Sequence, residues 1–268
     1  MNARLPMGAI VLGLVVFFGA LVGGCGLLPE SKDETGNWTV ERIFQTGREA
    51  VADGNYQRAI KMFETLESRY PYGPYAQAAL LQLAYANFKS GEMTAALSAA
   101  DRFIKQHPNH ANVDYAYYLK GIANFNEDFG FLASLASQDL SERDPKTLRE
   151  SYAAFRDLVA KFPESRYAAD SIARMKFLVN ALASGEVHVA RYYYNRGAYV
   201  ATASRAQSTV LTYPTAPVIE DALWLMVSAY DKLKLTELRD DARRVLEKTF
   251  PKSRYLAGEI EDPWWKVW

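Results

Sequence analysis

Five prolines that each directly follow an aromatic residue or a histidine divide the chain. They occur at Tyr70-Pro71, His107-Pro108, Phe162-Pro163, Tyr213-Pro214 and Phe250-Pro251. A glycine stands 17 residues before three of these prolines, at Gly54, Gly91 and Gly197. Apolar residues follow a helical period between each glycine and its proline, and again before each glycine. Glycine leaves a helix at no steric cost and proline cannot continue one, so each unit is predicted to be a helix, a glycine turn, a second helix and a proline stop.

The spacing of these prolines predicts how many units the chain holds and where they are interrupted. Successive prolines lie 37, 55, 51 and 37 residues apart. We place the additional residues of the two longer units at about 126–144 and in a long helix over 165–195. Single units cannot bury their apolar faces alone, so they stack on their neighbours. The sequence therefore predicts an all-α solenoid of five helix pairs over 39–255, with a groove lined by the first helix of each pair.

The first unit resembles the tetratricopeptide repeat. The residues that match its signature spacing are Gly47, Gly54, Tyr56, Ala59, Phe63 and Pro71. The resemblance implies that small residues let the paired helices approach and that the aromatic ring fills the space opposite. Later units depart from the signature, because Thr202 and Arg239 stand where it has alanine and Lys234 replaces the turn glycine of the fifth unit.

The amino terminus differs from the remainder of the chain. Arg4 supplies positive charge, and Met7 to Val22 is an apolar run too short for a membrane span of roughly 20 residues. The run ends in small residues before Cys25, an arrangement that resembles the lipobox of bacterial lipoproteins. We expect 1–24 to be a cleaved signal and Cys25 to carry a covalent lipid, although Val22 and Gly23 depart from the usual lipobox. The alternative is a plain secretory signal followed by a chance cysteine.

Two further features support the lipid anchor and its destination. Cys25 is the only cysteine, so it has no internal disulfide to make. Gly26 stands where many bacteria use aspartate to retain lipoproteins at the inner membrane, which favours the outer membrane. Residues 25–38 are polar after the first few positions and lack a helical period, so we interpret them as a flexible tether.

Charge and motif content argue against other classes of function. Lys plus Arg and Asp plus Glu both number 31, so no overall positive field recruits nucleic acid. The sequence shows no glycine-rich phosphate loop, no paired-cysteine metal site and no nucleophile elbow. His107 and His110 have no evident third ligand, whereas zinc sites need three or four. We therefore expect no enzymatic activity, no metal and no cofactor other than the lipid on Cys25.

Several strings resemble the BamD family, the lipoproteins of the bacterial outer-membrane β-barrel assembly machinery. They are "DGNYQRAI" at 53–60, "RYPYGPYAQ" at 69–77, "DRFIKQHPNHANVDY" at 101–115, "RDP" at 143–145 and "VARYYYNRGAYVA" at 189–201. The resemblance covers the chain from Cys25 to about Tyr255. The Trp-rich tail at 256–268 departs from it, and its role stays open.

This resemblance implies a non-enzymatic protein held by its lipid at the periplasmic face of the outer membrane. It implies binding to the periplasmic domains of the β-barrel subunit BamA, to accessory assembly lipoproteins and to unfolded outer-membrane β-barrel proteins. It associates the repeats at about 39–125 with substrate and those at about 164–252 with the partner, where Arg196, Tyr199 and Arg205 are expected to meet BamA. A solvated helix residue is the alternative for Arg205. The rival function is a scaffold for another periplasmic client, such as a cell-wall enzyme.

The string "RYPYGPY" at 69–75 suggests both a corner between helices and a recognition site. Tyr70-Pro71 ends one helix, Gly73 can serve as the N-cap of the next, and Pro74 suits its first turn. A corner needs at most one aromatic ring, so we expect part of a larger aromatic set to bind the aromatic-rich carboxy-terminal segment of an unfolded barrel protein. The set is Phe44, Tyr70, Tyr72, Tyr75, Tyr85, Phe88, Tyr115 and Tyr118. The alternative is that most of these rings are interhelical core, but at least two are expected to be exposed.

Overall fold

The structure is a computed structural model that describes residues 34–125 and 145–257. The predicted signal at 1–24, Cys25, the insertion placed at about 126–144 and the tail beyond 257 lie outside the described residues. The chain divides into a unit over 1–39 and a unit over 40–268. In the first unit, the described residues 34–39 include a turn in which the Trp38 N–H donates to the Thr35 carbonyl at 2.9 Å. The helices described below belong to the second unit.

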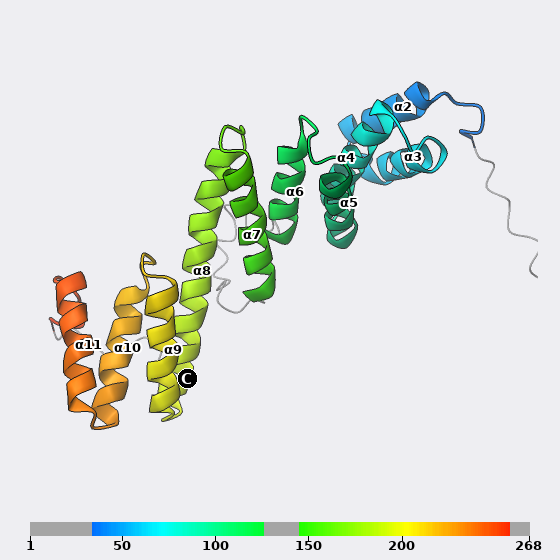
Figure 1. Ribbon diagram of the computed structural model, residues 1–268. Helices are drawn as coiled ribbons and strands as arrows, with labels where there is room; N and C mark the ends of the chain where they lie inside the picture. Colours follow the sequence, from blue (N-terminus) through cyan, green and yellow to red (C-terminus); the bar gives the residue numbers. More distant parts are fainter. Residues whose placement is uncertain (1–33, 126–144, 258–268) are drawn as a thin grey trace, which may run out of the picture. The chain divides into compact units, whose positions relative to one another are not determined.

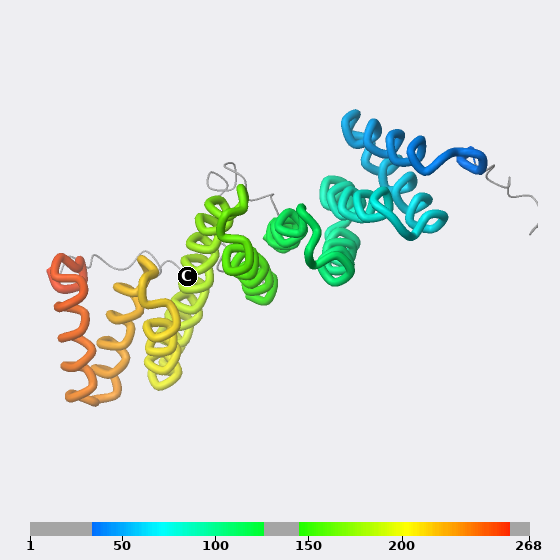
Figure 2. Tube along the Cα trace, turned by 45° about the horizontal axis from the view of Figure 1, so that its top comes forward, coloured from blue at the N-terminus to red at the C-terminus, as the bar shows by residue number. Residues whose placement is uncertain are grey.

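Ten α-helices account for most of the described part of the second unit (Figure 1). The first helices of the pairs are α2 (Val40–Ala52), α4 (Pro74–Lys89), α6 (Val113–Phe125), α8 (Ala168–Asn195) and α10 (Ile219–Lys232). The second helices are α3 (Tyr56–Arg69), α5 (Met93–Gln106), α7 (Pro145–Lys161), α9 (Tyr199–Thr212) and α11 (Thr236–Thr249). Each helix packs against the next one along the chain, an order that the tube in Figure 2 also follows. The predicted all-α fold of five helix pairs is confirmed, as is the long fourth-unit helix that ends at Asn195.

The turns within the pairs share one backbone conformation. Gly54, Gly91 and Gly197 have φ of 73°, 85° and 76°, in the left-handed region that glycine adopts freely. Lys234 takes the same position in the fifth unit with φ of 64°. Its turn keeps the same closing bond, because the Leu235 N–H donates to the Tyr230 carbonyl five residues back at 3.0 Å. The chain geometry thus persists where the glycine is lost, at a conformational cost of about 1–2 kcal/mol.

In two of the helix pairs, a glycine of the first helix faces a phenylalanine ring of the second helix. The lack of a side chain at the glycine lets the two helices of the pair approach closely. A Cβ built on Gly47 would lie 2.6 Å from Cε1 of Phe63, and one on Gly121 would lie 2.4 Å from Cε1 of Phe155. Both rings are fully buried. The tetratricopeptide interpretation of Gly47 and Phe63 is therefore confirmed, and Gly121 repeats it in the third pair.

Thr202 and Arg239, which stand where the repeat signature has alanine, have different surroundings. Thr202 is fully buried, and its hydroxyl donates to the Ala198 carbonyl at 3.1 Å, so a small polar side chain is accepted in the core. Arg239 lies at the surface and pairs with Asp231 at 3.1 Å and Asp240 at 2.8 Å. The α11 helix buries only Ala242 and Leu246, so it presents a polar outer face where the described repeats end.

The segment that follows α11 repeats the segment that follows α7. "FPESRYAA" at 162–169 opens α8, and "FPKSRYLA" at 250–257 is built the same way. In each copy the serine hydroxyl oxygen accepts a bond from the tyrosine N–H two residues on, at 3.2 Å. In the second copy the Tyr255 ring stacks on Trp224 of α10 at 5.2 Å. The segment therefore covers the last helix pair.

One carboxylate holds this covering segment to two helices. Asp221 of α10 accepts bonds from Arg191 of α8 at 2.5 Å, from Arg254 at 2.8 Å and from the Tyr255 hydroxyl. Burial and the bond to Asp221 raise the pKa of Tyr255 to about 12.

Within residues 34–125 and 145–257, no helix combines the length and the apolar character needed to cross a membrane.

Candidate functional site

The aromatic residues predicted to bind substrate divide into buried, partly buried and exposed rings. Phe44 and Phe88 are buried in the helical core. The Phe44 ring lies 6.1 Å from that of Phe63 and 5.5 Å from that of Tyr75, between α2, α3 and α4. The expectation that Phe44 and Phe88 face an open groove is therefore wrong, because their apolar side chains pack between helices.

The corner at 69–75 has the predicted construction. Gly73 is the N-cap of α4 with φ of 97°, and Pro74 is the first residue of that helix. Tyr72 is 90% exposed and Tyr70 is 38% exposed, so two rings of the predicted set reach solvent. Tyr75 is partly buried against Phe44. The corner thus presents one almost free ring, Tyr72, on a rigid backbone.

Three further predicted rings are partly buried, and two of them belong to a stacked group. Tyr118 of α6 stacks on Tyr167 at 4.6 Å, and Tyr115 lies 5.3 Å from the same ring. Tyr85 of α4 instead meets Tyr56 edge-on at 6.5 Å. Sequence reasoning missed Tyr167, although the Ser-Arg-Tyr string that recurs at 253–255 could have identified it.

The stacked group has a guanidinium and a carboxylate at its edge. The Arg166 guanidinium lies 4.7 Å from the centre of the Tyr167 ring. The Tyr118 hydroxyl donates to Asp170 at 2.9 Å, and burial followed by this bond raises its pKa to about 12. Burial also raises the pKa of Tyr115 above its usual range. These phenols stay neutral at physiological pH, so the group offers apolar ring surface and polar tips to a ligand.

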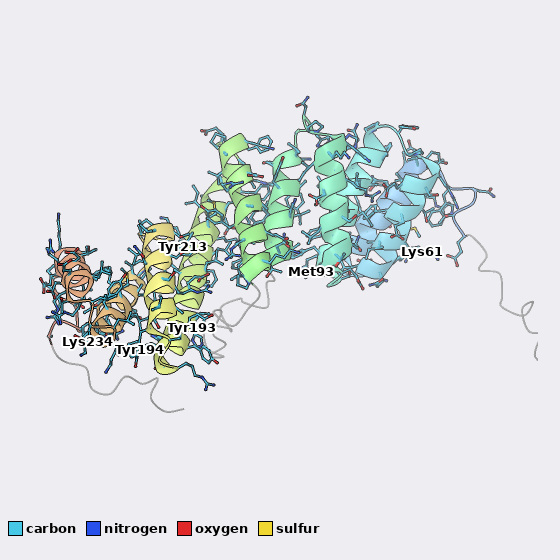
Figure 3. All side chains as sticks on the ribbon, turned by 60° about the horizontal axis from the view of Figure 1, so that its bottom comes forward. Lys61, Met93, Tyr193, Tyr194, Tyr213 and Lys234 are labelled. Atoms are coloured by element: carbon cyan, nitrogen blue, oxygen red, sulfur yellow. The ribbon has the colours of Figure 1, made fainter. Side chains whose placement is uncertain are left out.

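The residues predicted to meet the partner lie around the end of α8 and on α9. Arg196 is exposed and lies 5.4 Å from the ring centre of Tyr192. Tyr199 packs edge-on against Tyr194 at 5.4 Å. Figure 3 labels Tyr193 and Tyr194 near this end of α8. The third residue, Arg205, lies beside the ring of Tyr193, which is 6.0 Å from the ring of Tyr192.

Arg205 pairs with Glu186 of α8 at 2.6 Å, and Arg149 of α7 lies 3.8 Å from the same carboxylate. The Arg205 guanidinium also lies 6.0 Å from the centre of the Tyr193 ring. The bond to Glu186 raises the pKa of Arg205, so this side chain is a permanent cation. We name Arg149, Glu186, Tyr193 and Arg205 the arginine cluster. Sequence reasoning found only Arg205, since the other three lie at spacings that no local motif defines.

The predicted pair of histidines does not belong to a metal-binding group in the part of the chain that the structure describes. Within 34–125 and 145–257, no group of three or more His, Cys, Asp or Glu side chains could hold a metal ion. The rings of His107 and His110 pack on Phe103 at 5.4 and 5.1 Å, which gives them a structural role.

Comparison with known proteins gives matches over nearly the whole chain. The YfiO family model, described as "Outer membrane lipoprotein", matches residues 37–246. A protein named outer membrane protein assembly factor BamD from Neisseria meningitidis serogroup B is 46% identical over 95% of this chain and 98% of its own length. The protein of that name from Xylella fastidiosa strain Temecula1 is 37% identical over 95% of this chain and 86% of its own. The crystal structure of MamA protein aligns over 83% of this chain and 95% of its own, with a TM-score of 0.38 and 16% identity.

Proposed function

The chain belongs to the BamD family of outer membrane protein assembly factors, and on that basis we propose that it is a non-enzymatic factor that promotes folding and insertion of outer-membrane β-barrel proteins. The 46% identity over 95% of the chain is the observation that carries this proposal. The described helix pairs support it, because repeats of this kind offer extended surfaces for protein ligands. Catalysis is not needed for such a role.

The proposed location is the periplasmic face of the outer membrane, with Cys25 as the lipid attachment site. The apolar run before Cys25 and the lack of another cysteine support the anchor. Two or more acyl chains would be needed for stable residence in the membrane. Changing Cys25 to Ala should release the protein from the outer-membrane fraction. A Cys25→Ala protein that has lost its signal and still fractionates with the outer membrane would rule out the lipid anchor.

The proposed partner is the set of periplasmic domains of the β-barrel subunit BamA, bound by the carboxy-terminal repeats. The partly exposed, cationic Arg205 supports this contact, since a guanidinium pairs strongly with a carboxylate in a partly desolvated interface. Arg205→Glu should weaken co-purification of BamA and leave the helical circular dichroism unchanged. Arg102→Glu, which changes an arginine of α5 that pairs with Glu67, is the matched control and should leave co-purification intact. If the wild type, Arg205→Glu and Arg102→Glu recover equal amounts of BamA, Arg205 does not belong to the interface. Accessory assembly lipoproteins are the proposed further members of the complex.

The proposed substrate surface lies on the amino-terminal repeats, around Tyr70, Tyr72, Tyr115 and Tyr118. Tyr167, which directly precedes α8, stacks on the last two rings. Exposed rigid aromatic rings give contact area at low entropic cost. Tyr70→Ala with Tyr72→Ala should weaken binding of a fluorescent peptide that ends in the aromatic-rich segment of a barrel protein. Fluorescence anisotropy measures the affinity. The single variant Tyr72→Ala should leave the melting temperature nearly unchanged because Tyr72 is 90% exposed, whereas Tyr70 is 38% exposed and its loss can also affect stability.

The control for this surface is Phe44→Ala, which removes a buried ring. It should reduce the free energy of unfolding by the roughly 3–5 kcal/mol typical of such a change, and so lower the melting temperature, with little effect on peptide affinity near 20 °C. Unchanged peptide binding by the double tyrosine variant would leave the corner with a structural role only. Co-purification of a cell-wall enzyme in place of BamA would favour the rival scaffold function.

A further inference from the structure

The arginine cluster places two guanidinium groups on one carboxylate. Arg149, Glu186 and Arg205 come from three successive helices, α7, α8 and α9. The side chain of Glu186 is 22% exposed, whereas those of Arg149 and Arg205 are 59% and 38% exposed. The carboxylate therefore lies deeper than the cations that it holds. The long α8 helix makes this arrangement possible, because it packs against α7 and also against α9.

The arginine cluster has more positive than negative charge and more hydrogen-bond donors than the Glu186 carboxylate can accept. Two permanent cations face one anion, so the three side chains carry a net positive charge. A guanidinium has five N–H donors, and the bond to Glu186 uses one nitrogen of Arg205, Nη1, at 2.6 Å. Tyr193 follows Glu186 by seven residues, which places both on one side of α8, and its ring lies beside the Arg205 guanidinium. The cluster can accept a second carboxylate from outside.

We propose that Glu186 is an internal substitute for a carboxylate of the partner and that it sets the strength of partner binding. This inference rests on the proposed contact between Arg205 and the partner. An acidic side chain of the partner binds Arg205 from the solvent side, and Glu186 shifts its pairing toward Arg149. In the free protein Glu186 keeps the Arg205 side chain ordered, but its charge competes with the incoming carboxylate and repels it. Glu186 is thus a positioning residue for the interface.

The test is the affinity of the full-length protein for purified BamA periplasmic domains, measured by isothermal titration calorimetry. Glu186→Gln keeps an oxygen that accepts a bond from Arg205 and removes the competing charge. A partly exposed ion pair contributes about 0.2–1 kcal/mol, so we expect binding about 1.4 to 5 times tighter than in the wild type. Arg149→Gln should weaken binding by a similar factor, because Glu186 then has only Arg205 as its partner.

A double-mutant cycle and a remote control separate this mechanism from a general loss of charge. If Arg149 acts only through Glu186, Arg149→Gln should have little effect in the Glu186→Gln background. Glu67→Gln removes a comparable carboxylate, 29% exposed and paired with Arg102 at 2.5 Å on distant helices, and should leave the affinity unchanged.

The outcomes distinguish the inference from the proposed function on which it rests. Wild-type protein that binds the BamA domains, with Glu186→Gln binding equally or more weakly, overturns the inference and leaves the partner contact standing. Wild-type protein that does not bind at all overturns both. Tighter binding by Glu186→Gln alone, with Glu67→Gln unchanged, supports the role of Glu186.

Discussion

The close approach of α2 and α3 depends on Gly47, and changing this residue to alanine tests the packing account. A Cβ there would lie 2.6, 2.9 and 3.0 Å from three atoms of the Phe63 ring, whereas carbon atoms in good contact are about 3.5–4.0 Å apart. The ring is fully buried and has Phe44 as a neighbour, so it has little room to move. Crowding a packed core costs about 1–3 kcal/mol.

Helix propensity opposes this cost. Glycine to alanine in a helix interior gains about 0.8–1.0 kcal/mol, so we expect Gly47→Ala to reduce the free energy of unfolding by about 0–2 kcal/mol. Each kcal/mol corresponds to about 2–4 °C in the melting temperature for a chain of this size. Far-UV circular dichroism on heating measures the shift. The smaller side chain of Phe63→Leu leaves room for the added Cβ, so Gly47→Ala should cost less stability in a Phe63→Leu background than in the wild type. The difference is the coupling energy, which we expect to be about 0.5–3 kcal/mol.

The sign of the change decides whether the reasoning holds. The second helix pair supplies a natural comparison, because Ala84 and Ala100 stand 37 residues after Gly47 and Phe63 and are both buried without a ring. If Gly47→Ala raises the melting temperature, as propensity alone predicts, the ring does not limit the approach of the helices. Additive effects in the double variant would contradict the account in the same way.

Two further predictions concern the carboxy-terminal pair. Lys234→Gly should raise the melting temperature by about 2–4 °C, because it removes roughly 1 kcal/mol of left-handed strain, and a decrease would contradict this. Tyr255 has a pKa of about 12 in the folded chain and about 10 when unfolded, so its contribution to stability is complete below pH 10 and is lost as the pH rises toward 12. The melting temperature should therefore fall more steeply between pH 10 and 12 in the wild type than in Tyr255→Phe, and parallel curves would refute the assignment.

Local chemistry made the helix pairs predictable from the sequence. Glycine and proline determine where helices end, and the apolar period shows which segments are helical, so neither requires knowledge of distant contacts. The turn at Lys234 shows the limit of this reasoning. Residue type argued against a left-handed conformation there, but the packing of α10 on α11 imposes it.

The candidate sites were less predictable because they depend on contacts between distant residues. Repeat alignment assigned Phe44 and Phe88 to a helix face, but it could not say that neighbouring helices cover that face. The sequence led us to expect at least two exposed rings in the set but did not identify Tyr72, which lies between Pro71 and Gly73, as one of them. Arg149, Glu186 and Arg205 meet across 37 and 19 residues of sequence, a juxtaposition that no periodicity encodes.

Depletion of the chain from the bacterium that encodes it tests the proposed assembly function most directly. The measurement is the fraction of outer-membrane β-barrel proteins that migrate in the folded, heat-modifiable form on a gel. We expect this fraction to fall on depletion and to be restored by the wild-type chain but not by Arg205→Glu at equal abundance. An unchanged folded fraction after depletion would contradict the role of this protein in outer-membrane protein assembly.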